Sequence, residues 1–155
     1  TSAIKTFTQK VGWKDLDFII VDMPPGTGDT QLTFSQEIKM DGAIIVSTPQ
    51  EVALLDVKRG IKMFDKLGVK ILGLVDNMSY FTGDDGKKYK IFGEGGVKKT
   101  AEEFDKKFLG EIPINPEVGK CGDEGKPIVE SNPDHEISKI YLDFANKIKL
   151  DFLNE

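Results

Sequence analysis

Asp22 follows a short apolar run and opens a turn that is rich in proline and glycine. The residues from Phe18 to Val21 are all aliphatic or aromatic, which predicts a strand buried on both faces of a parallel α/β sheet. Ligands of such sheets bind outside the carboxyl ends of the strands, so a carboxylate there can hold Mg²⁺ through water beside nucleotide phosphates. A strand that ends in an acidic turn residue is also common without a ligand, and this alternative stays open.

The turn after Asp22 has a composition that an ordinary connection seldom needs. Its prolines stiffen the chain, while Gly26 and Gly28 leave backbone N–H groups open to an anion or to a moving switch. Asp29 follows directly, and its carboxylate could also serve simply as the cap of the next helix.

Asn77 and Pro113 each follow a further apolar run. An amide can both donate to and accept from adenine, and backbone next to a proline can read the edge of a base, so the two residues could frame a flat base. On the residues alone, the simpler interpretation is that Asn77 caps a turn and that Pro113 ends a strand.

Three further strands and three helices should position these residues. Strands are expected at 43–47, 69–75 and 108–112, and helices from just after Thr48 to about 66, over 97–104 and from about 133 onwards. In the first of these helices, an apolar stripe recurs at intervals of three or four, formed by Leu54, Val57, Ile61, Phe64 and Leu67. Thr48, Pro49 and Glu51 predict a capping box, and Gly68 a glycine just after the helix end. The alternation predicts an α/β fold, a mostly parallel sheet flanked by helices, with residues 1–155 as a single unit.

Charge and composition argue against several classes of partner. The net charge of −5 disfavours a nucleic-acid or anionic-membrane surface, and no apolar run is long enough to cross a bilayer. A single cysteine, Cys121, excludes an intrachain disulfide and fits a cytoplasmic location. Cys121 is expected to be inert, and His135 to be a surface residue without a role.

Several blocks of the sequence resemble the Mrp/ApbC group of P-loop ATPases, relatives of the MinD and nitrogenase iron-protein ATPases that carry or insert iron–sulfur clusters. The resemblance runs nearly end to end. The blocks are Val21-Asp22-Met23-Pro24-Pro25-Gly26-Thr27-Gly28-Asp29, Ile45 to Asp56, Asp76-Asn77-Met78-Ser79-Tyr80, Ile91 to Gly96, Leu109 to Pro113 and Gly125 to Ile128.

The resemblance implies a set of site residues and ligands. It implies ATP and Mg²⁺ as cofactors, hydrolysis that rearranges a homodimer, and iron–sulfur client proteins as partners. Asp22 and Asp29 become the candidate catalytic residues, with Asp22 also holding Mg²⁺ through water. The candidate nucleotide contacts are Pro24, Gly26, Thr27, Gly28, Asn77 and Pro113, the last two beside the adenine.

The sequence also departs from the group in two ways. The glycine- and lysine-rich phosphate loop, which should lie upstream, does not occur, so we expect a carboxyl-terminal part of a Rossmann-like P-loop NTPase domain that is inactive alone. Residues 80–89 carry no Cys-x-x-Cys, so we expect no cluster ligands here, and the sequence leaves open whether a cluster is carried. The alternative is a non-catalytic module that dimerises or binds a partner.

Overall fold

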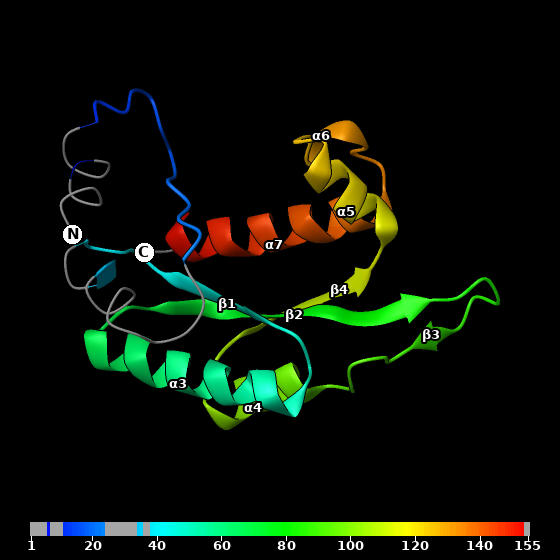
Figure 1. Cartoon of the computed structure of the whole chain (residues 1–155). Coiled ribbons are helices and arrows are strands. Elements are labelled where there is room, and N and C mark those ends of the chain that lie inside the picture. Colours follow the sequence, from blue (N-terminus) through cyan, green and yellow to red (C-terminus); the bar gives the residue numbers. More distant parts are fainter. Residues whose placement is uncertain (1–5, 7–10, 24–33, 36–37, 154–155) are drawn as a thin grey trace.

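A computed structural model describes residues 6, 11–23, 34–35 and 38–153 (Figure 1). Within them, four strands form one sheet, in which β2 pairs with β1, β3 and β4. The elements, in chain order, are β1 Ala43–Ser47, α3 Glu51–Leu67, β2 Ile71–Thr82, β3 Lys88–Tyr89, α4 Gly96–Glu103, β4 Phe108–Ile114, α5 Pro116–Asp123, α6 Ile128–Ser131 and α7 Glu136–Leu153.

The sheet is covered on both faces, as Figure 1 shows, with α3 and α4 on one side and α7 on the other. Strands β1 and β4 both run parallel to β2, whereas β3 forms an antiparallel hairpin with the end of β2. One apolar core joins Leu74 to α3 and α4, and a second joins Val75 to α5, α6 and α7. The predicted α/β fold with a mostly parallel sheet is therefore confirmed.

Helix α3 follows the predicted apolar stripe but not the predicted start. Leu54, Val57 and Ile61 are buried against the sheet, and Gly68 has a φ of 69° just after the helix end, as expected for a glycine there. The prediction of a capping box is wrong, because Gln50 is the N-cap residue and its side chain accepts no hydrogen bond from the helix. The Thr48 hydroxyl instead bonds the Gln50 side-chain oxygen at 3.1 Å, so it does not cap the helix.

The strand predicted at residues 18–21 is not present. Residues 18–21 have no regular structure, and all four side chains are exposed, Ile20 by 93%. A parallel strand is held by hydrogen bonds to neighbouring strands, and no described residue pairs with this segment. The apolar run indicated a residue preference for burial, but pairing depends on distant parts of a chain.

Strands β2 and β4 are both longer than predicted. β2 continues past Asn77 to Thr82, where its last residues pair with β3. β4 passes through Pro113 to Ile114, which is possible because β4 pairs with β2 alone among the described strands and has a free edge. The hairpin was missed because its second strand is only two residues long.

The last helix begins three residues later than expected, and His135 caps it. The His135 Nδ1 atom accepts a hydrogen bond from the backbone N–H of Ile137 at 3.1 Å, and its Nε2 atom lies 3.5 Å from the Glu117 carboxylate. Its side chain is 18% exposed, so it is more buried than the expected surface residue, and the expectation that it has no functional role stays a prediction. An acceptor at Nδ1 requires a ring with its proton on Nε2.

Two glycines that lie in helices make a matched test of how closely α4 packs against the turn before α3. A Cβ atom on Gly96 would lie 2.8 Å from the Pro49 carbonyl oxygen, whereas one on Gly122 would have no atom within 4 Å. We expect Gly96→Ala to destabilise the protein by about 1–3 kcal/mol through overpacking, and Gly122→Ala to stabilise it by roughly 0.5–1 kcal/mol. Urea unfolding of both variants checks this, and equal effects would contradict the close contact between α4 and the turn before α3.

Candidate functional site

The parallel part of the sheet ends in a row of polar residues. Ser47 of β1 pairs with Asp76 of β2, and Asp76 pairs with Glu111 of β4. Side chains of directly paired residues point to the same face of a sheet. The carboxyl end of β1 and the middle of β4 therefore meet the middle of β2 in a polar row. Open α/β sheets bind ligands beside the carboxyl ends of their strands.

Asn77 lies one residue further along, beside Pro113. It pairs with Ile112, the residue before Pro113, and it is partly exposed. Its side-chain amide makes no hydrogen bond to another described residue. The two residues that were predicted to frame a base are thus adjacent across the ladder, and the Asn77 amide is available to a ligand.

The backbone changes direction directly after Asn77. Met78 has a φ of 54°, and the register between β2 and β4 shifts between Asn77 and Phe81. A left-handed residue other than glycine within a strand is uncommon, and such irregularities concentrate beside functional sites. The interruption separates Asn77, which pairs with Ile112, from the next parallel pair, Phe81 with Ile114.

Asp22 lies away from this edge. Its segment contacts the end of α7 through Phe18, whose ring centroid is 6.0 Å from that of Phe152. The neighbouring Asp151 pairs with Lys107, just before β4 begins, so the segment lies at the amino end of the sheet (Figure 1). The prediction that Asp22 lies at a carboxyl strand end is therefore wrong in this structure, and its role as a metal-binding residue stays a prediction.

The rest of the predicted switch lies outside the described residues. This holds for the predicted nucleotide contacts Pro24, Gly26, Thr27 and Gly28, and for the second candidate catalytic residue, Asp29. Among the residues that the structure describes, no group of three or more His, Cys, Asp or Glu side chains could hold a metal ion.

Asp76 is the site residue that the sequence interpretation missed. Its side chain is buried, with a residue exposure of 1%, yet neither carboxylate oxygen accepts a hydrogen bond from a described residue. Burial, and then the charge of Glu111, raise its pKa to about 6, against a smaller lowering by Lys90. An acid that directly follows the apolar run 71–75 was the signal that could have identified it.

Lys90 connects this acidic pair to the hairpin. Its ammonium lies 3.3 Å from a Glu111 oxygen and 5.2 Å from the centroid of the Tyr80 ring. Lys88 lies over the same ring at 4.1 Å. Cations over an aromatic face are attracted by its quadrupole, so Tyr80 partly offsets the repulsion between the two ammonium groups.

The hairpin of β2 and β3 projects beyond the rest of the sheet (Figure 1). Phe81 and Tyr89 pair across it and are both exposed. In its turn, the Lys87 N–H and the Tyr89 hydroxyl donate to Asp85, and these bonds lower the pKa of that carboxyl. Phe92, three residues after Tyr89, is half-buried.

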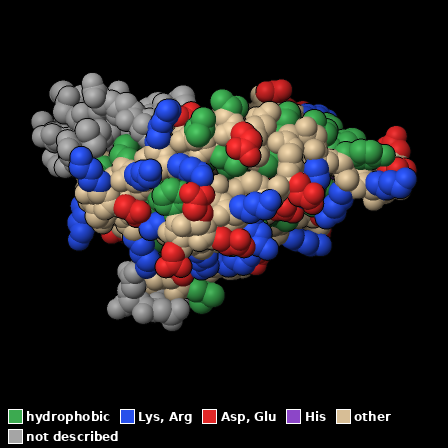
Figure 2. All heavy atoms as spheres, turned by 90° about the horizontal axis from the view of Figure 1, so that it is seen from below, with side chains coloured by type: hydrophobic (Ala, Val, Ile, Leu, Met, Phe, Trp, Pro, Cys, Tyr) green, Lys and Arg blue, Asp and Glu red, His purple; other side chains and the backbone are tan. Residues whose placement is uncertain are grey.

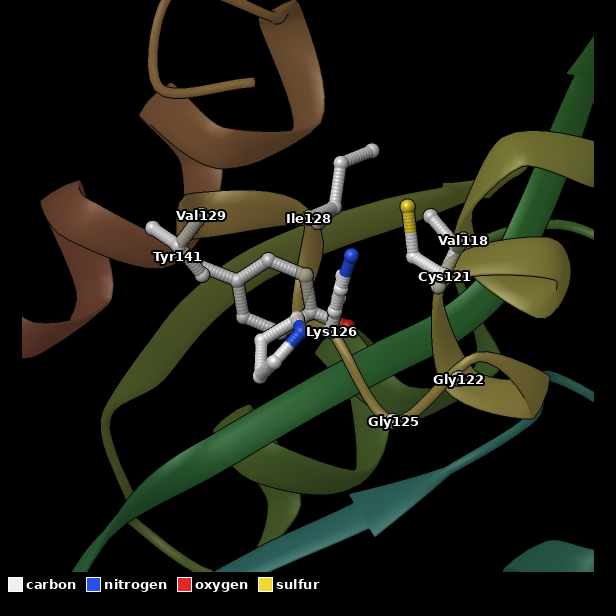
Figure 3. A pocket seen from close by; sticks show the side chains of 9 residues that line it. Val118, Cys121, Gly122, Gly125, Lys126, Ile128, Val129 and Tyr141 are labelled. Carbon is white, nitrogen blue, oxygen red and sulfur yellow. The ribbon is translucent and has the colours of Figure 1, made fainter. Parts of the chain in front are cut away.

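A cavity of about 400 Å³ lies between α5, α6 and α7. Figure 3 shows the Cys121 and Lys126 side chains at this cavity. Cys121 is 8% exposed. The remaining lining residues are mostly apolar, namely Val118, Gly122, Gly125, Pro127, Ile128, Val129 and Tyr141.

The face covered by α3 and α4 carries charges of both signs. Figure 2 shows basic and acidic side chains interspersed over it, and three ion pairs there join Lys58 to Glu103, Arg59 to Asp56 and Lys106 to Asp65. Among the helices of the described residues, none has the length and apolar character that a membrane crossing needs.

The chain is similar to a known protein family and to several known proteins. The family model described as "ParA: NUBPL iron-transfer P-loop NTPase" matches residues 1–149. An iron–sulfur cluster carrier protein of Aquifex aeolicus is 46% identical over 92% of this chain and 40% of its own length. An Arabidopsis thaliana mitochondrial iron–sulfur protein required for NADH dehydrogenase is 49% identical over 95% of this chain and 47% of its own. The chain thus spans about half the length of these relatives.

Two solved structures are also similar to this chain. A nucleotide-binding protein of Archaeoglobus fulgidus in complex with ADP is similar with a TM-score of 0.75 and 39% identity, over 86% of this chain and 55% of that one. MinD of Pyrococcus horikoshii in complex with Mg-ADP is similar with a TM-score of 0.70 and 22% identity, over 95% of this chain and 54% of that one. The second likeness supports the fold alone.

Proposed function

The chain belongs to the ParA-type family of iron-transfer P-loop NTPases, and on this premise we propose that it serves in ATP-dependent transfer of iron–sulfur clusters to client proteins. The observation that carries the nucleotide part is the Asn77 amide beside Pro113, at the point where the register between β2 and β4 shifts. No described residue hydrogen-bonds this amide. A relative that is 39% identical was solved with ADP, which supports an adenine nucleotide as the ligand.

The described residues are better suited to binding the adenine base than to binding Mg²⁺. The Asn77 amide can donate and accept at once, which suits the edge of adenine, and Pro113 offers backbone without a competing N–H. Asp22 is an exposed carboxylate and would hold Mg²⁺ only through water, with phosphate oxygens as further ligands. Bound Mg²⁺ would neutralise phosphate charge during hydrolysis.

Replacement of Asn77 tests the base-reading role. We expect Asn77→Ala to weaken binding of ATP and ADP by about tenfold in a protein that joins this sequence to a phosphate loop, because one or two hydrogen bonds to the base are lost. Binding of GTP should change little. Isothermal titration with each nucleotide measures this, and Asn146→Ala, an exposed asparagine of α7, is the matched control. Equal losses for ATP and GTP would remove Asn77 from base recognition.

Hydrolysis by the 155-residue chain on its own is not expected. The sequence has no glycine-rich loop with a phosphate-binding lysine, and that loop supplies most of the charge stabilisation in phosphoryl transfer. A phosphate-release assay on the purified chain should give no rate above background. Turnover that survives removal of contaminating ATPases would contradict this.

A second candidate function is a dimerising or partner-binding module. Its supporting observation is the apolar surface on β1 and on the hairpin, where Val46 is 58% exposed and Tyr89 is 47% exposed. A homodimer should show a mass that rises with concentration in sedimentation equilibrium. A dimer that binds no nucleotide would favour this function over the first.

A further inference from the structure

The residues around Asp76 tie the hairpin to the body of the protein. We propose that Asp76 is a positioning residue, whose buried carboxylate acts through the Lys90 ammonium to hold the hairpin of β2 and β3 against the sheet. The proposal is independent of nucleotide binding. It rests on the buried carboxylate, which no described residue hydrogen-bonds, and on its place opposite Glu111 in the sheet. It rests also on the ion pair of Lys90 with Glu111 and on the two cation contacts to Tyr80.

The charged groups that face Asp76 are few. Glu111 comes from the neighbouring position of β4, and Lys90 from the segment just after β3. On its other side, β1 contributes the uncharged Ser47. The buried residues of α3 and α4 are uncharged, among them Leu54, Val97 and Thr100. Two carboxylates thus share a single described ammonium, whose lysine lies at the base of the hairpin.

The hairpin has little else to hold it in place. Its second strand makes only two pairs with β2, Phe81 with Tyr89 and Thr82 with Lys88, and most of its side chains are exposed. Segments with few buried contacts open locally at low free energy. One additional attraction at Lys90, directly after Tyr89, is therefore enough to change how often the hairpin opens.

The charge state of Asp76 sets that attraction. When Asp76 is ionised, its carboxylate attracts the Lys90 ammonium in addition to that of Glu111. When Asp76 is protonated, only Glu111 attracts it. Its pKa is raised to about 6, mainly by burial, so the hairpin should become more protected as the pH rises through about 6. Burying the charge costs free energy at the same time, so the stability of the whole protein should fall over the same range.

Hydrogen exchange tests the proposal, because the two effects have opposite signs. Amides of the hairpin, such as that of Gly83, which donates to the Lys87 carbonyl at 2.9 Å, are followed by NMR from pH 5 to 8. After correction for intrinsic rates, we expect protection in the native sequence to rise about fivefold across pH 6, the size of one partly screened charge pair. Asp76→Asn should lack this rise, and Lys90→Met should lack it too.

Asp85→Asn is the matched control. This carboxylate accepts bonds within the hairpin turn and its pKa is lowered, so the variant should protect the hairpin less at every pH and still show the rise near pH 6. A pH profile in Asp76→Asn that matches the native sequence would overturn the proposal. If Asp76→Asn does not fold, an unchanged profile in Lys90→Met would overturn it equally.

Discussion

Replacing Asp22 by Asn in a protein that joins this sequence to a phosphate loop is expected to lower Mg²⁺-dependent ATP hydrolysis at least about a hundredfold, since a displaced Mg²⁺ leaves phosphate charge uncompensated in the transition state. Asn keeps the size of the side chain and removes its charge. Asp22 is exposed in the structure, so the substitution should leave folding intact. Phosphate release at saturating ATP, with Mg²⁺ varied, measures the effect.

Asp17→Asn is the control for Asp22→Asn. Asp17 is a second exposed carboxylate of the same segment, and its removal should leave turnover unchanged. Loss of activity in both variants would point to general electrostatics of the segment. Unchanged turnover in a folded Asp22→Asn protein would remove Asp22 from the site.

Replacing Asp76 should stabilise the protein above neutral pH and change its pH dependence. The folded-state pKa is raised from 3.8 to about 6, so the folded state binds more protons than the unfolded state between these values. Stability from this residue is therefore greatest below pH 3.8 and is lost as the pH rises through about 6. A shift of this size corresponds to about 3 kcal/mol at pH 8.

Urea unfolding of the native sequence and of Asp76→Asn, at pH 4.5 and pH 8, measures this directly. The variant should gain roughly 1–3 kcal/mol relative to the native sequence at pH 8, and little at pH 4.5. Taking the difference between the two proteins at each pH cancels the titration of other carboxylates. A difference that is the same at both pH values would show that Asp76 does not titrate near pH 6. Glu111→Gln, the half-exposed neighbour, should give a smaller gain.

A residue that costs stability in this way is typical of a functional position. Natural sequences break local rules mainly where function requires it. A buried carboxylate is normally hydrogen-bonded, and no described residue hydrogen-bonds that of Asp76. The acid lies in a strand that is otherwise apolar from Ile71 to Val75, apart from one glycine.

Local signals in the sequence predicted α3, α4, α7 and the general fold well. The stripe of Leu54, Val57 and Ile61 identified α3, and Gly68 its end, because both depend only on neighbouring residues. The strand at 18–21 was wrong, because pairing is not local. Helix α5 was missed, although Asn115 caps it and Pro116 begins it, since the segment contains two glycines and little apolar periodicity.

The nearness of two candidate site residues could be predicted from the sequence, whereas their roles stay predictions. Asn77 and Pro113 were chosen from separate segments, and parallel pairing of β2 with β4 brings them together. The link from Asp76 through Glu111 and Lys90 to Tyr80 could not be predicted, because it depends on the register shift of β4 after Leu74 and on a hairpin that returns Lys90 to the sheet. Register is a property of the whole sheet.

The measurement that tests the central claim most directly is transfer of ⁵⁵Fe-labelled cluster from the native protein to an apo iron–sulfur acceptor, with and without Mg-ATP. We predict that Mg-ATP accelerates transfer, that a non-hydrolysable analogue does not, and that Asn77→Ala raises the ATP concentration needed. Transfer at one rate under all of these conditions, or no labelled iron bound at all, would contradict the proposed function.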